Sequence, residues 1–174
     1  GPYRFLVDTG ADRTAISKDI ATNLRLETGL KASLHSVAGV SRVATATVPN
    51  LQLTRNPVRI VDAPLLDAVN MGADGILGVD SLRSQRVMFD FEAQTMSIVP
   101  AAAPDFHDEE GTIVVTAARR NGRLVVTEAK ANNRPLTVVL DTGAQISIGN
   151  AALRRQLEAN GSIGTAQQIE LDSV

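Results

Sequence analysis

The sequence predicts a mostly β protein with two similar β-rich lobes related by a pseudo-two-fold axis, the second lobe being incomplete. Three observations predict this fold class. The tetrapeptide Asp-Thr-Gly-Ala occurs at 8–11 and again at 141–144. A strand-forming apolar run precedes each copy, and glycine, proline and asparagine turns separate most other apolar segments. An Asp-Thr-Gly triplet is expected at about one position in several thousand, so two copies in 174 residues indicate a repeat.

The repeat extends beyond the tetrapeptide. A shift of 133 residues, from position 8 to position 141, also aligns the flanking sequence. Three further positions match: Pro2 with Pro135, Ile20 with Leu153, and Leu24 with Leu157. Within the first copy Ile20 and Leu24 are four residues apart, as Leu153 and Leu157 are within the second, and this spacing places them on one face of a helix. The predicted shared unit is therefore a strand, a turn that begins with aspartate, and a helix.

Residues 1–100 are predicted to form the first lobe from short strands separated by turns. A hairpin is expected over residues 34–48, with Ala38, Gly39 and Val40 at its tip, where it could fold over a cleft. The other expected elements are strands at 42–48 and 51–54, a helix at 80–84 with Asp80 as its N-cap, and a hairpin of strands 86–91 and 95–99.

Residues 101–111 are predicted to be a linker, because they are rich in proline, alanine and acidic residues and have no apolar period. Residues 112–174 are predicted to form the front part of the second lobe. Its expected elements are strands at 112–118 and 124–129 around an Asn121-Gly122 turn, and a turn at 132–134 that leads into the strand before Asp141.

Composition excludes several classes of function. With a net charge of -2 and 3% aromatic residues, the chain has neither the basic surface nor the stacking platform expected for nucleic-acid binding. No apolar run approaches the roughly 20 residues that cross a bilayer, so no membrane segment is expected. Without cysteine, thiol nucleophiles and disulfides are excluded. His35 and His107 lack metal-ligand spacing, and no Gly-x-Ser-x-Gly elbow is present, so no metal site or serine nucleophile is expected.

The two repeated aspartates, Asp8 and Asp141, predict a pair of facing carboxylates. Equivalent positions in two similar lobes meet across an approximate two-fold axis. Two carboxyl groups within hydrogen-bonding reach share one proton, so one acts as an acid while the other acts as a base. Such a pair can activate a water molecule against a carbonyl without a metal or a covalent adduct. The expected reaction is amide hydrolysis, and no cofactor is expected.

The neighbouring residues fit an active-site turn. Gly10 and Gly143 let backbone N–H groups approach the carboxylates, and Thr9 and Thr142 offer hydroxyl groups that can bond backbone across the lobe junction. The expected supporting residues are Thr9, Gly10, Ala11, Thr142, Gly143 and Ala144. The alternative is that Asp-Thr-Gly is only turn chemistry, which two copies in matched contexts make less attractive.

The residues Phe5 to Asp12 resemble the active-site motif of the retropepsin-like (pepsin-related) aspartic proteases, and two fused lobes resemble the bacterial type. Ile76, Leu77 and Gly78, called the glycine element below, are similar to the hydrophobic-hydrophobic-glycine segment that passes beneath the catalytic turn in this family. The resemblance implies an aspartic endopeptidase that acts on proteins or peptides outside the cytoplasm, with the hairpin around Gly39 as a flap. Where the viral enzymes carry a bracing arginine after the glycine, this chain has Val79 and Asp80.

The second lobe differs from the first. Gln145 stands where the first copy has Asp12, and equivalents of the flap and the glycine element are not expected within residues 112–174. We therefore expect a fragment of a longer protein, with completion by a second chain or a degenerate lobe as alternatives. Two other functions stay open. One is a catalytically silent module for peptide binding or assembly, and the other is an enzyme active only as a homodimer through Asp8 of each copy.

Overall fold

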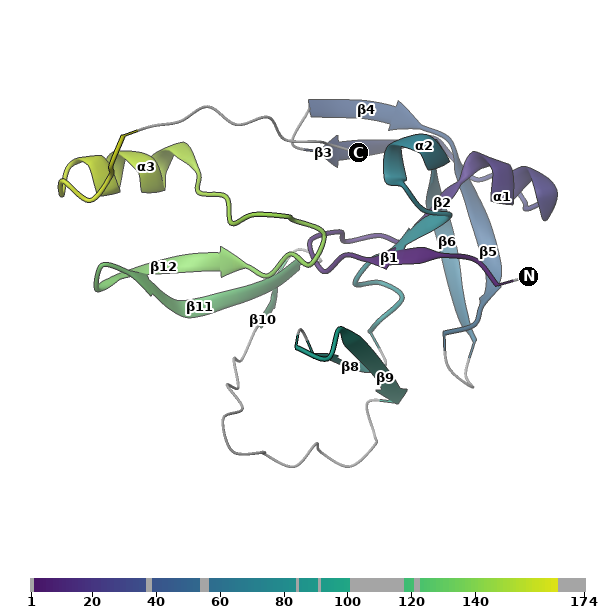
Figure 1. The fold of residues 1–174 in the computed structure, drawn as a ribbon. Coiled ribbons are helices and arrows are strands. Elements are labelled where there is room, and N and C mark those ends of the chain that lie inside the picture. The colour runs from purple at the N-terminus through teal and green to yellow at the C-terminus, as the bar shows by residue number, and fades with distance from the viewer. Residues whose placement is uncertain are drawn as a thin grey trace.

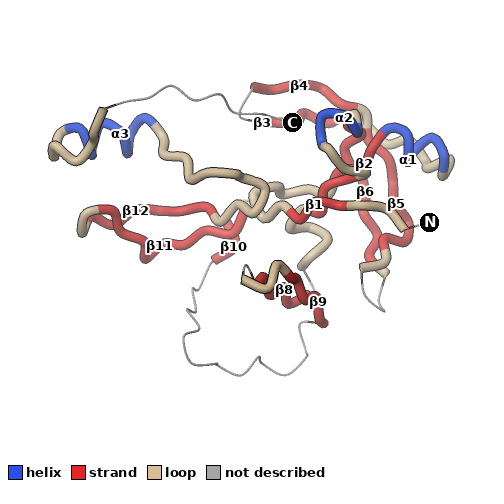
Figure 2. Tube along the Cα trace, in the orientation of Figure 1, coloured by secondary structure: helices blue, strands red, loops and turns tan. Residues whose placement is uncertain are grey.

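The computed structural model describes residues 2–36, 39–53, 57–83, 85–90, 92–100, 118–120 and 123–165. Twelve strands and three helices occur in these residues, so the described part of the chain is mostly β, as predicted (Figures 1 and 2). The helices are α1 (Lys18–Asn23), α2 (Ala68–Met71) and α3 (Ala151–Glu158). None of these three is long and apolar enough to cross a membrane.

A five-stranded sheet organises the N-terminal half of the chain, in the order β1-β7-β2-β6-β5. Its strands are β1 (Phe5–Val7), β7 (Gly75–Leu77), β2 (Ala15–Ser17), β6 (Val58–Leu66) and β5 (Thr45–Leu51). Strand β7 lies between β1, to which it is parallel, and β2, to which it is antiparallel. The segment from residue 8 to residue 14 joins β1 to β2 and therefore crosses the carboxyl end of β7.

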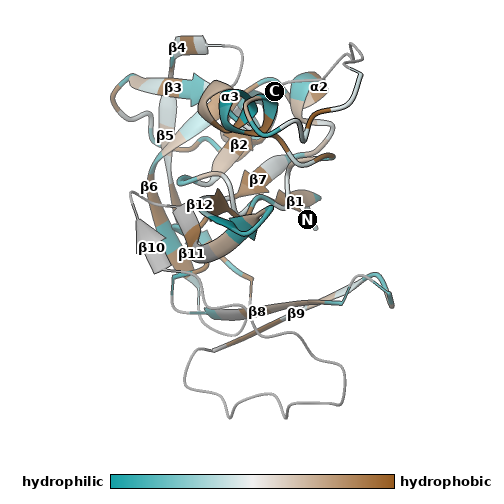
Figure 3. Ribbon diagram, turned by 90° about the vertical axis from the view of Figure 1, so that its left-hand side faces the viewer, coloured by the Kyte–Doolittle hydropathy of each residue, from teal (hydrophilic) through white to brown (hydrophobic). Residues whose placement is uncertain are grey.

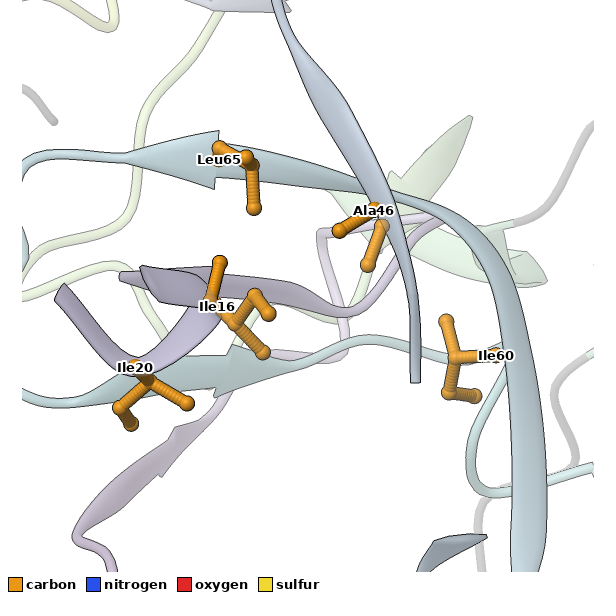
Figure 4. Packing of buried hydrophobic residues seen from close by; sticks show 7 residues of the cluster. Ile16, Ile20, Ala46, Ile60 and Leu65 are labelled. Atoms are coloured by element: carbon orange, nitrogen blue, oxygen red, sulfur yellow. The ribbon is translucent and has the colours of Figure 1, made fainter. Parts of the chain in front are cut away.

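One hydrophobic cluster holds α1 against this sheet. Its buried members are Ile16, Ile20, Ala21, Ala46, Ile60, Ala63 and Leu65, contributed by β2, α1, β5 and β6 (Figure 4). The helix begins at its N-cap Ser17, whose hydroxyl accepts a hydrogen bond from the backbone N–H of Ile20 at 3.2 Å. The expected apolar face is confirmed only in part. Ile20 is buried, but Leu24 ends the helix and is 49% exposed.

The expected hairpin is present as β3 (Ala32–Ser36) and β4 (Gly39–Val43), paired antiparallel with Ser36 opposite Gly39. Gly39 has a φ of 133°, which side chains other than glycine's rarely permit. Gly39 and Val40 therefore lie beside the tip, as expected, and Ala38 lies outside the described residues.

The predicted bounds of the strands at 42–48 and 51–54 were partly wrong. The single strand expected at 42–48 is interrupted at Ala44, between β4 and β5. Pro49 and Asn50, expected to be a turn, lie inside β5, and the strand expected at 51–54 ends at Leu51. Because β5 is an edge strand, it tolerates a proline without an N–H. Thr54 lies outside the described residues.

The prediction of a helix at 80–84 was also wrong. Residues 80–83 form turns, and Ser84 is not among the described residues. Asp80 is not an N-cap, because its carboxylate accepts hydrogen bonds from Thr14 and from the next backbone N–H, of Ser81. This side chain joins two distant segments of the chain instead of starting a helix.

The next hairpin is confirmed, as β8 (Gln85–Asp90) and β9 (Thr95–Pro100). In Figures 1 and 3 it lies apart from the five-stranded sheet. The linker expected at 101–111 and most of the strand expected at 112–118 lie outside the described residues, as does the Asn121-Gly122 turn.

Three antiparallel strands precede the second motif: β10 (Ala118–Arg120), β11 (Arg123–Ala131) and β12 (Arg134–Val139). The strand expected at 124–129 lies within β11. The expected turn is confirmed at Asn132 and Asn133, whose φ values are 47° and 61°. The helix predicted from Leu153 and Leu157 is α3, but no residue of α3 is buried.

Candidate active site

The two Asp-Thr-Gly-Ala turns lie against each other although 133 residues separate them. The first turn leaves β1, and the backbone N–H of Asp8 donates to the carbonyl oxygen of Leu77 in β7 at 3.0 Å. The second turn follows β12, which ends at Val139, with Leu140 between them. Figure 1 shows these two turns meeting near the centre of the molecule, between the five-stranded sheet and the β10–β12 sheet.

Four hydrogen bonds join the two turns through Thr9 and Thr142. The backbone N–H of each threonine donates to the hydroxyl oxygen of the other at 3.1 Å. The Thr9 hydroxyl donates to the carbonyl oxygen of Leu140 at 2.8 Å, and the Thr142 hydroxyl donates to that of Val7 at 2.7 Å. Each hydroxyl therefore donates one bond and accepts another, and the two sets are equivalent under the repeat.

The glycines face the carboxyl groups of the opposite turn. A Cβ atom added to Gly10 would lie 2.6 Å from Oδ2 of Asp141, and one added to Gly143 would lie 2.9 Å from Oδ2 of Asp8. Real Cβ atoms do not approach other atoms so closely. The absence of a side chain at these two positions therefore lets the carboxyl groups come together.

Backbone N–H groups hold the two carboxylates. Oδ1 of Asp8 accepts hydrogen bonds from Gly10 at 2.8 Å and from Ala11 at 3.0 Å. Oδ1 of Asp141 accepts one from Gly143 at 2.9 Å. Ala144 takes part through its backbone, donating to the carbonyl oxygen of Asp141 at 3.4 Å. The six expected supporting residues thus surround the two aspartates.

The surroundings of Asp8 raise the pKa of its carboxyl group above the ordinary value of 3.8. Burial is the largest cause, followed by the negative charge of Asp141; a hydrogen bond with the Asp141 carboxyl group acts in the same direction. The N–H groups of Gly10 and Ala11 partly oppose the shift because they favour the ionised form. Asp8 therefore retains a proton to higher pH than a free aspartate.

The glycine element lies directly under the first turn. Ile76 and Leu77 are buried in β7, and Gly78 follows. The backbone N–H of Val79 donates to the carbonyl oxygen of Ala11 at 2.9 Å, which fastens this segment to the middle of the Asp8 turn. Residues 76–78 therefore lie where the sequence resemblance implied.

The contact between Thr14 and Asp80 was not predicted from the sequence, in which Asp80 was expected to be a helix N-cap. Thr14 is 0% exposed and donates to Oδ1 of Asp80 from its backbone at 2.8 Å and from its hydroxyl at 2.6 Å. One sequence signal pointed to this contact. Val79 and Asp80 stand where the viral enzymes carry the bracing arginine, so another residue has to hold the Asp8 turn.

A cavity of about 440 Å³ lies beneath the β3–β4 hairpin. Lys18 lies at its wall and pairs with Asp67, with 2.8 Å between Nζ and Oδ1. The cavity is lined by Lys18, Leu34, Ser36, Gly39, Val40, Ser41, Arg42, Val43, Ala44, Leu65, Leu66, Asp67 and Asn70. Two of the three residues expected at the flap tip, Gly39 and Val40, thus border a hollow. Among the described residues, no group of three or more histidine, aspartate or glutamate side chains could hold a metal ion.

A strand that ends in Asp-Thr-Gly, crossed by an Ile-Leu-Gly segment, defines an aspartyl-protease-like fold for the N-terminal half. Residues 1–84 match the family model for gag-polyprotein putative aspartyl protease, so this part of the chain is retropepsin-like. Asp8 lies inside the matched residues and Asp141 outside them. No curated protein and no solved structure matches the chain.

Proposed function

We propose that this chain is an aspartic endopeptidase in which Asp8 and Asp141 form the dyad that activates water. The observation that supports the proposal is the reciprocal hydrogen bonding of Thr9 and Thr142, which joins the two aspartate-bearing turns. Thr9, Gly10, Ala11, Thr142, Gly143 and Ala144 support the pair. The family match supports protease-type activity for residues 1–84 and leaves the contribution of Asp141 to experiment.

The two aspartates have different roles in this mechanism. Asp8 holds the shared proton, since its pKa is raised, and donates it toward the carbonyl oxygen of the scissile peptide bond. Asp141 accepts a proton from water while the water oxygen attacks the carbonyl carbon. The tetrahedral intermediate then collapses: a hydroxyl group of the intermediate returns a proton to Asp8 as the C=O bond re-forms, the C–N bond breaks, and the leaving nitrogen takes up the proton that Asp141 received.

The substrate is a protein or peptide bound in extended form beneath the β3–β4 hairpin. An extended peptide satisfies its backbone groups by strand-like pairing and places alternate side chains in pockets. The cavity between this hairpin and α2 is suited to one such side chain, because its walls combine apolar Leu34, Val43 and Leu65 with charged Lys18 and Asp67. Gly39 and Val40 then act as part of a flap.

The proposed organisation keeps two lobes, with residues 1–100 as the first, residues 101–111 as a linker and residues 112–174 as part of the second. Each lobe supplies one aspartate. The equivalence of the threonine bonds under the 133-residue shift supports this division.

Substitution of each aspartate by asparagine tests the mechanism. Asp8→Asn and Asp141→Asn are each expected to lower kcat by about 100-fold to 10,000-fold, the usual contribution of acid–base catalysis. Both variants should remain folded by circular dichroism, because asparagine keeps an oxygen for the backbone N–H groups. Asp90→Asn is the matched control, since its carboxylate also accepts a backbone N–H, from Ala93, but in the β8–β9 turn. Undiminished hydrolysis by Asp141→Asn would remove this residue from the mechanism.

A second candidate is a catalytically silent peptide-binding module. Exposure of the entire segment 141–150 favours it, because a catalytic carboxyl group normally lies in a more enclosed site. Peptide binding without cleavage between about pH 3 and pH 8 would support this candidate, since that range spans the titration of a carboxyl pair. The homodimer through Asp8 is distinguished by activity that rises with the square of protein concentration at high dilution.

A further inference from the structure

We infer that Asp80 is a positioning residue for the proposed dyad, clamping the far end of the Asp8 turn at Thr14 to the segment beneath it. The inference rests on the proposed function and adds to it a residue outside both Asp-Thr-Gly-Ala motifs.

A single carboxylate oxygen of Asp80 makes the clamp. Oδ1 accepts hydrogen bonds from the backbone N–H of Thr14 at 2.8 Å, from the Thr14 hydroxyl at 2.6 Å and from the backbone N–H of Ser81 at 2.8 Å. Thr14 and Ser81 are 0% and 1% exposed, so water does not replace the carboxylate as their acceptor. Hydrogen bonds to an ionised acceptor are also stronger than those between neutral groups.

Thr14 and Ser81, the two residues that donate to Asp80, are also hydrogen-bonded to Gly78 of the glycine element. The Thr14 hydroxyl, which donates to Asp80, accepts a hydrogen bond from the backbone N–H of Gly78 at 3.1 Å. The Ser81 hydroxyl donates to the carbonyl oxygen of Gly78 at 2.9 Å. A Cβ atom on Gly78 would lie 2.6 Å from the carbonyl oxygen of Arg13, so the two segments are in direct contact.

Both ends of the Asp8 turn are therefore attached to one segment. Asp8 is hydrogen-bonded to Leu77 at the start of the turn, and Thr14 is hydrogen-bonded to Asp80 at its end. Val79 is bonded to Ala11 between them. Loss of the Asp80 contacts frees only the end of the turn, so the expected consequence is a displaced Asp8 carboxyl group in a protein that is still folded.

The Asp141 turn has no such clamp among the described residues. Ser147 occupies the position equivalent to Thr14 under the 133-residue shift and is exposed. The Asp141 turn is instead joined to the Asp8 turn through Thr9 and Thr142. Asp80 thus acts on both aspartates, on one directly through the turn and on the other through the threonines.

The test compares Asp80→Ala with Asp80→Asn in the full chain. Alanine removes all three hydrogen bonds, whereas asparagine keeps an Oδ1 acceptor in the same place. We expect Asp80→Ala to lower kcat by about 100-fold with little change in KM, the size of effect that misplacement of a reacting group by about 1 Å produces. Asp80→Asn is expected to recover most of the activity. Asp90→Ala, which removes one carboxylate-to-backbone bond in the β8–β9 turn, should leave kcat unchanged.

A second readout does not depend on turnover. In a titration of carboxyl-¹³C-labelled aspartate by NMR, Asp80→Ala should lower the pKa of Asp8 toward 3.8, because the turn moves away from Asp141. Asp80→Asn and Asp90→Ala should leave it in place. If Asp80→Ala, measured well below its melting temperature, keeps both kcat and the Asp8 titration, Asp80 only stabilises the fold and the inference is overturned. If the unmodified chain hydrolyses no peptide, the proposed function fails, and the titration alone decides the role of Asp80.

Discussion

Thr9 and Thr142 each donate a backbone N–H to the hydroxyl oxygen of the other, and both bonds measure 3.1 Å. Each hydroxyl group also donates a hydrogen bond to a backbone carbonyl oxygen just before the opposite motif, from Thr9 to Leu140 and from Thr142 to Val7. Because the same two side chains connect both turns, the distance between Asp8 and Asp141 depends on them. Neither threonine needs to touch a substrate to affect activity.

Thr9→Ala is therefore expected to weaken both the fold and the dyad. It removes the hydrogen bond that the Thr9 hydroxyl donates to Leu140 and the one that it accepts from the backbone N–H of Thr142. Each is worth about 1 kcal/mol, so the free energy of unfolding should fall by about 2 kcal/mol in urea denaturation. kcat should fall as well. Thr9→Ser keeps the hydroxyl and should recover both. Thr22→Ala is the control, because it removes the hydroxyl of an exposed residue that donates to the carbonyl oxygen of Lys18 within α1; an equal loss of activity in that variant would contradict the prediction.

The raised pKa of Asp8 predicts how stability depends on pH. The folded state holds the Asp8 proton more tightly than the unfolded state does, so this contribution to stability is complete below pH 3.8 and is lost as pH rises through the folded-state pKa. Asp8→Asn cannot ionise and avoids that loss. The urea midpoint of Asp8→Asn minus that of the unmodified chain should therefore increase from about pH 3 to about pH 8. A difference independent of pH would show that Asp8 titrates as it does in the unfolded chain.

The strand before each motif and the turn and helix after it could be predicted because the repeat marks the same three elements twice. The hairpins β3–β4 and β8–β9 followed from alternating residues around turn residues. Asp80 was misassigned because an aspartate before a short segment has the same local pattern whether it caps a helix or binds Thr14, 66 residues away. The approach of Gly10 to Asp141 is likewise a long-range contact that local sequence does not encode.

Substitution of Gly10 by alanine should separate the two aspartates. The new Cβ atom would lie 2.6 Å from Oδ2 of Asp141, so one turn must move. Peptide hydrolysis is expected to fall about 100-fold, and the pKa of Asp8 should decrease because the charge of Asp141 moves away. Gly164→Ala is the matched control, because a Cβ atom there meets nothing within 4 Å. Wild-type activity in Gly10→Ala would mean that the observed approach of the turns is not needed for catalysis.

Filling the cavity beneath the β3–β4 hairpin should affect substrate binding more than catalysis. Ser41 lies opposite Leu34 and both residues line the cavity, whereas Ser33 lies on the other face of the hairpin and is not among the lining residues. The cavity of about 440 Å³ is large enough for an indole ring, so Ser41→Trp should occupy it without unfolding the hairpin. KM for peptides that extend several residues beyond the scissile bond should rise, whereas kcat should change little. Ser33→Trp adds the same bulk on the outer face and should leave KM unchanged; equal effects of the two variants would place the peptide elsewhere.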